Sequence, residues 1–150
     1  MAIEITEPMY IVNVEVVVWH EGRYLAITRA ATEAVGAGDA SFPGGKVDLN
    51  LAAIDVLEET ARREVWEEVG LSLIDPVLYV ESHTFGTESF PVLDVVMLAR
   101  IEPGSPVASP QEVERAEWLT FEAMMSHPQV QAWTQASLVR ADILRQKMGW

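Results

Sequence analysis

The 150-residue sequence contains no cysteine, which excludes disulfides, thiolate metal sites and cysteine nucleophiles. Basic residues are scarce: 10 Lys and Arg stand against 23 Asp and Glu, and the formal net charge is −13. This balance argues against binding to a nucleic-acid polymer, because neutralising a phosphate backbone needs clustered Lys and Arg. No apolar stretch reaches the ~18 residues of a membrane span. Residues 1–8 lack the basic and apolar regions of a signal peptide.

What remains is an ordinary globular composition, with 49% hydrophobic and 22% charged residues. The length fits one domain over residues 1–150 with a single substantial core. We therefore expect a cytoplasmic protein that binds neither a membrane nor a nucleic-acid polymer.

Apolar alternation and β propensity predict four strands, at residues 10–19, 24–29, 76–82 and 91–101. The first two form a hairpin, and the last is apolar enough to be covered on both faces. Loops are expected at 30–40 and 83–90. After a short strand at 117–119, Thr120 caps one helix, and a second helix begins at 126–128 with a proline in its first turn.

The segment around residue 64 predicts an amphipathic helix with an unusual acidic face. Glu64, Glu67 and Glu68 stand at i, i+3 and i+4, so their carboxylates share one stripe. An apolar stripe that includes Val65 and Val69 lies beside it and would hold the helix against a core. Mutually repelling carboxylates at the edge of a core suit Mg²⁺ or Mn²⁺, which prefer oxygen ligands. The alternative for such a face alone is a solvated acidic helix.

The surrounding residues favour the metal-binding interpretation. Pro43, Gly44 and Gly45 precede the helix, and Gly70 can end it in a left-handed conformation. The whole stretch resembles the Nudix box, G-x5-E-x7-R-E-U-x-E-E-x-G-U, where U is an apolar residue. The second half matches at every position, with Arg63, Glu64, Val65, Glu67, Glu68, Gly70 and Leu71.

The first half of the box departs from this pattern. Counting back from Arg63, the first family glutamate falls on Asp55, whereas counting forward from Gly45 it falls on Leu51. The difference, 55 − 51, is a four-residue insertion in the loop 48–54. Asp55 either supports the site as the family glutamate does, or serves as the N-cap of a capping box with Glu58.

The resemblance implies an α/β (α+β) fold, the Nudix αβα sandwich with a mixed β-sheet. It also implies a Mg²⁺-dependent hydrolase, with Mn²⁺ as the alternative ion, in which a metal-activated water attacks phosphorus. The metal ligands would be Glu64, Glu67, Glu68 and the carbonyl of Gly44. The proton acceptor would be Glu64, Glu67 or a loop acid, and the sequence does not choose among these three. Of the two loop acids, Glu112 and Glu114, we take Glu114 as the candidate.

Arg29, Gly45 and Lys46 are the expected substrate-binding residues, and Arg63 the expected support of the box. The lack of cysteine argues against Nudix-related isopentenyl diphosphate isomerases and NADH-cleaving enzymes. Strands beginning near Met1 leave no room for the N-terminal domain of dimeric ADP-ribose hydrolases, although a homodimer stays open. The expected substrates are nucleoside tri- or diphosphates or dinucleoside polyphosphates. The rival hypothesis is a non-catalytic Nudix-like nucleotide-binding module.

Overall fold

A computed structural model describes residues 7–33 and 36–150 of the chain. The N-terminal residues 1–6, on which most of the signal-peptide argument depends, and residues 34–35 of the expected 30–40 loop lie outside this part. The elements in chain order are β1 (Ile11–His20), β2 (Arg23–Arg29), β3 (Ala40–Ser41), β4 (Gly44–Lys46), α1 (Val56–Val69), β5 (Leu73–Thr87), β6 (Phe90–Ile101), β7 (Val113–Leu119), α2 (Phe121–Met125) and α3 (Ala132–Lys147).

The strands form one mixed sheet in the order β3-β2-β1-β6-β5, with β4 also paired to β1 and β7 to β2. β1 runs parallel to β6, while the β1–β2, β2–β7 and β5–β6 pairs are antiparallel. The predicted hairpin of the first two strands and the interior position of β6 are both present.

The sheet divides between β1 and β2. These strands pair only next to their turn, at Trp19 with Tyr24 and His20 with Arg23. Further along, the same edge of β1 pairs with β4, and β3 pairs with β2. The segment 40–46 therefore crosses the opening between the two strands. The buried side chain of Phe42 anchors the middle of this segment in the core.

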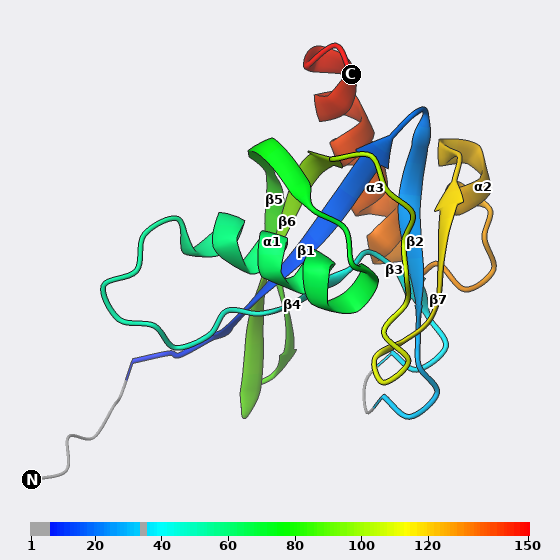
Figure 1. Cartoon of the computed structure of the whole chain (residues 1–150). Coiled ribbons are helices and arrows are strands. Elements are labelled where there is room, and N and C mark those ends of the chain that lie inside the picture. The colour runs from blue at the N-terminus through cyan, green and yellow to red at the C-terminus, as the bar shows by residue number, and fades with distance from the viewer. Residues whose placement is uncertain (1–6, 34–35) are drawn as a thin grey trace, which may run out of the picture.

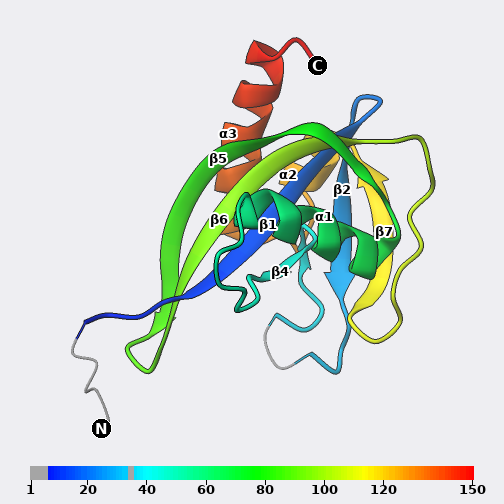
Figure 2. The ribbon, with the colours of Figure 1, turned by 60° about the vertical axis from the view of Figure 1, so that its left-hand side comes forward.

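Helices cover both faces of the sheet (Figures 1 and 2). Val65 and Val69 of α1 pack with Val14 and Val16 of β1 on one face. On the other face, α2 and α3 pack against strand side chains that point in the opposite direction, such as Val17 of β1. Leu138 of α3 belongs to this second layer. This alternation along the strands gives two apolar layers and confirms the predicted αβα sandwich.

The helix α1 ends where the sequence predicts. Ala61, Val65 and Val69 are fully buried on its sheet-facing side. Gly70 follows with φ 67°, and its N–H donates to the carbonyl of Trp66 at 2.9 Å. A left-handed residue at this point favours glycine because a side chain would be strained there.

The start of α1 differs from the expected capping box. Asp55 occupies the N-cap position, but its backbone is left-handed, with φ 53° and ψ 38°. A capping side chain normally leaves an extended backbone and bonds the N–H groups of the first turn. The carboxylate of Asp55 makes no such hydrogen bond, so the capping interpretation is wrong.

Two other expectations need correction. The predicted loop at 83–90 continues β5 to Thr87 and turns directly into β6, because an edge strand can carry polar residues. The last helix begins at Ala132 rather than at 126–128, since Val130 is held in a β-bridge with Ala40. Thr120 does cap α2, accepting from the N–H of Ala123 at 3.1 Å. None of the helices in the described part is long and apolar enough to cross a membrane.

Candidate active site

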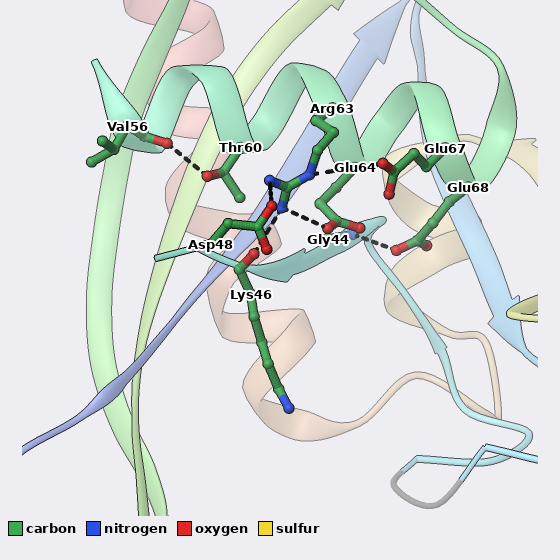
Figure 3. A network of polar contacts seen from close by, with 9 residues as sticks. All are labelled: Gly44, Lys46, Asp48, Val56, Thr60, Arg63, Glu64, Glu67 and Glu68. Atoms are coloured by element: carbon green, nitrogen blue, oxygen red, sulfur yellow. Dashed lines mark hydrogen bonds and ion pairs between the residues drawn. The ribbon is translucent and has the colours of Figure 1, made fainter. Parts of the chain in front are cut away.

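The acidic side of α1 faces the glycine turn before β4. Glu68 is only 3% exposed, and its Oε1 accepts a hydrogen bond from the N–H of Gly44 at 3.2 Å. One turn earlier, Glu64 points to Gly45 and accepts from the guanidinium of Arg63 at 3.0 Å. Figure 3 shows both carboxylates directed from the helix toward this strand.

The two glycines are required by space. A Cβ at Gly45 would lie 2.3 Å from the carboxyl carbon of Glu64, and one at Gly44 would lie 2.2 Å from the carbonyl oxygen of Val14. Neither glycine has the positive φ that would demand glycine for its backbone conformation. The pair therefore lets β4 pass between β1 and the acids of α1.

A third carboxylate, that of Glu112, comes from the loop before β7. This loop is fixed on the C-terminal end of α1, where the N–H of Ser109 donates to the carbonyl of Glu68 at 2.8 Å. On its other side, the carbonyl of Glu112 accepts from the N–H of Ala30 at 3.0 Å. The first bond uses a helix-end carbonyl that has no partner within the helix, and together the two bonds hold Glu112 beside the acids of α1.

Glu64, Glu68 and Glu112 form a group that can hold a cation. One carboxylate oxygen from each lies within 4.8 Å of the others. The set consists only of oxygen donors, which fits hard divalent ions better than softer metals. The group lines a cavity of about 310 Å³, whose other walls include Arg29, Gly44, Gly45 and Lys46.

Burial and mutual repulsion change the acidity of this group. Burial raises the pKa of Glu68 to about 8, helped by the neighbouring Glu64 and Glu112, although the Gly44 N–H opposes the shift. Burial also raises the pKa of Glu64, against the effect of its bond to Arg63. A bound cation would reverse both shifts, because it stabilises the ionised carboxylates.

Arg63 joins the helix to the strand, as expected of a support residue. Its guanidinium donates to the carboxylate of Asp48 and, at 2.8 Å, to the carbonyl of Lys46 (Figure 3). Asp55, the expected supporting acid, is exposed at the far end of the helix and takes no part in this network. Asp48, the first residue of the lengthened loop, pairs with Arg63 instead.

The other predicted site residues differ in whether they line the cavity. Arg29 and Lys46 line the cavity, and Figure 3 shows the Lys46 side chain extending away from the helix. Glu67 lies outside the group of three; its side chain is 54% exposed, with its Oε1 3.9 Å from Nε of Arg63. Glu114 is exposed on β7 and does not line the cavity. Glu112, the alternative loop acid, is the one that reaches it.

Comparison with known proteins agrees with this arrangement. The family model described as the NUDIX domain matches residues 9–141. No match was found among curated proteins.

Solved structures share the fold over most of the chain. The MutT NUDIX hydrolase from Burkholderia pseudomallei is 26% identical, with a TM-score of 0.72, and the match covers 88% of this chain and 98% of that one. The MutT protein from Methanosarcina mazei Go1 is 24% identical, with a TM-score of 0.77 and coverage of 95% and 99%. A NUDIX hydrolase from Nitrosomonas europaea is 16% identical, with a TM-score of 0.72 and coverage of 90% of each chain.

The family model matches most of the chain, and Gly45, Glu64 and Glu68 of the box line one cavity. The chain therefore belongs to the NUDIX domain family and is a Nudix-type hydrolase acting on phosphoric anhydrides.

Proposed function

We propose that the protein hydrolyses a diphosphate linkage in a nucleoside tri- or diphosphate or a dinucleoside polyphosphate, with Mg²⁺ as the cofactor and Mn²⁺ as the alternative ion. The observation that carries this proposal is the convergence of Glu64, Glu68 and Glu112 with Arg29 and Lys46 on one cavity. Carboxylates alone would repel a diphosphate. A cation held by them, together with two basic side chains, would attract it.

Each residue has a proposed role. Glu68 and Glu112 hold the ion, and the carbonyl of Gly44 and the carboxylate of Glu67 remain further candidate ligands. Glu64 accepts the proton of the attacking water, because its carboxylate lies beside the two that would hold the ion. Arg29 and Lys46 contact phosphate oxygens. A bound divalent ion supplies charge neutralisation and lowers the pKa of water.

The test is hydrolysis of a panel of nucleoside di- and triphosphates and dinucleoside polyphosphates, with Mg²⁺, Mn²⁺ or a chelator. Added inorganic pyrophosphatase would let a phosphate assay count released pyrophosphate as well. We expect Glu64→Gln to lower kcat by roughly 10²-fold or more, the usual contribution of a general base. Glu68→Gln should instead raise the metal concentration needed for half-maximal rate.

Glu59→Gln is the matched control, because Glu59 lies on the same helix and pairs with Arg62 away from the cavity. It should leave turnover unchanged. Metal-independent turnover, or full activity in Glu64→Gln and Glu68→Gln, would contradict the proposal. Metal-dependent nucleotide binding by the wild type without turnover of any substrate would favour the non-catalytic binding module.

A further inference from the structure

A second cavity, also of about 310 Å³, lies at the opposite end of the sheet from the carboxylates. Its walls include Trp19 and His20 at the end of β1, Ile74 of β5, Arg100 of β6 and Trp150 after α3. Figures 1 and 2 place the β1–β2 turn and the C-terminal end of α3 together at the top of the molecule. The two cavities share no lining residue.

Arg100 lines this second cavity from β6, the strand between β1 and β5. On the two neighbouring strands its register partners are Trp19 of β1 and Ile74 of β5. Its guanidinium carbon lies 4.2 Å from the ring centroid of Trp150, which closes the cavity from the side of α3. The half-buried Arg100 therefore has apolar and aromatic side chains beside it, while the exposed Glu21 of the β1–β2 turn also lines the cavity.

Within the part of the chain that the structure describes, this guanidinium has no anionic partner. Its Nε is buried without a hydrogen-bond acceptor, and among the described residues no carboxylate pairs with it. Arg145 provides a comparison, because it also stacks on an indole, that of Trp19, yet it binds Asp142 at 2.9 Å. A partly buried donor without an acceptor is costly, and an anionic ligand would remove that cost.

We propose that this cavity binds a small ligand that carries both an anionic group and a flat aromatic ring, with the anion on Arg100 and the ring against Trp150. Indole faces suit flat rings, and a guanidinium suits phosphate or carboxylate oxygens. A nucleoside monophosphate has both features. The proposal does not rest on the proposed function, because it uses none of the residues of the carboxylate cavity.

The experiment is calorimetric titration with adenosine monophosphate in the presence of a chelator, which removes metal-dependent binding at the carboxylates. We expect Arg100→Gln to weaken binding by about tenfold or more, the effect of losing a charged hydrogen bond. Arg23→Gln is the matched control, because Arg23 is the exposed first residue of β2 and does not line the cavity. It should bind as the wild type does.

Further titrations separate the two parts of the ligand. Adenosine and inorganic phosphate should each bind more weakly than the monophosphate, and Trp150→Leu should weaken the monophosphate but not phosphate. Equal binding by the wild type and Arg100→Gln, or no binding at all, would overturn the proposal. Loss of binding in Glu68→Gln with retention in Arg100→Gln would move the ligand to the carboxylate cavity. Thermal unfolding and nucleotide hydrolysis by Arg100→Gln report whether the variant is folded.

Discussion

Gly45 and Glu64 show how closely single residues are fitted at the site. The glutamate carboxylate occupies the volume that any side chain at position 45 would need. A methyl group there must displace either the carboxylate or the strand β4, and the carboxylate is the more mobile of the two. The glycine thus controls where a reacting group lies without touching substrate through a side chain.

Gly45→Ala should accordingly impair catalysis more than folding. We expect kcat/KM to fall by roughly 10²-fold, since a displacement of about 1 Å can have that effect. Gly104→Ala is a suitable control, because the nearest atom to its added Cβ would be 3.6 Å away. Steady-state kinetics and thermal unfolding of both variants provide the measurement, and wild-type kinetics in Gly45→Ala would contradict the steric argument.

Glu68 should make stability without metal depend on pH. Its folded-state pKa of about 8 lies above the ordinary 4.5, so the folded protein keeps a proton that the unfolded chain loses. The stabilisation from Glu68 is then complete below the ordinary value and is lost as the pH rises toward about 8.

In a chelator, we expect the Tm of the wild type to fall over this pH range more steeply than that of Glu68→Gln. Mg²⁺ or Mn²⁺ should restore the wild type most strongly at the upper end of the range, where the carboxylates are ionised. Scanning calorimetry across the pH series measures both effects. Identical slopes for the two proteins would show that Glu68 is not the group responsible.

At the scale of elements, the contact between α1 and β4 explains why the insertion is compatible with the site. Arg63 is held by the carbonyl of Lys46 in β4 and by Asp48 at the very start of the lengthened loop. The added chain therefore extends the connection to α1 without separating the helix from the glycine turn. Asp55, beyond the insertion, is left with no part in that contact.

Asp48→Asn and Asp55→Asn should consequently differ. The first weakens the anchoring of Arg63, whose other acidic contacts, Glu64 and Glu67, are on α1 itself. We expect a several-fold loss of kcat with a small change in Tm, as is usual for exposed ion pairs. The second should be neutral. Kinetics of both variants, with Asp48→Glu as the conservative control, provide the test, and a larger effect at Asp55 would restore the original assignment.

The sequence was informative where the cause of an element is local. Val65, Val69 and Gly70 determine the position and the end of α1 through periodicity and backbone geometry, and both were predicted. The choice of Glu112 over Glu114 was not predictable, because it depends on Ser109 binding the end of a helix some 40 residues earlier in the chain. The pairing of Asp48 with Arg63 was not predictable either, because it joins the loop before α1 to the helix through a tertiary contact.

At the scale of the whole molecule, the two apolar layers make separate contributions. The α1 layer carries the site, while the layer under α3 supports the sheet from the other side. Predicting the αβα sandwich required only the order of elements and the box. The start of α3 and the end of β5 depended on tertiary contacts, such as the bridge of Val130 to Ala40 and the pairing of Phe85 with Val92, which no local pattern contains.

Leu138→Ala should therefore lower stability and spare chemistry. Leu138 is fully buried under the sheet, and removing such a side chain typically costs about 2–5 kcal/mol. Its neighbour Val139 is 37% exposed, and Val139→Ala should change the free energy of unfolding by no more than about 0.5 kcal/mol. Urea unfolding and kcat/KM below the transition provide the measurements. A large loss of kcat/KM in folded Leu138→Ala would show that the layers are coupled.

The divergence of β1 from β2 bears on how the site meets its ligand. The segment 40–46 is bonded to one strand at each end, so widening or closing the opening would break backbone hydrogen bonds on both sides. The glycine turn is thereby preorganised, and little backbone entropy remains to be lost when a ligand binds. Adaptation to different substrates should fall to side chains and to the 47–55 connection, so that the substrate range can change while the position of the reacting groups does not.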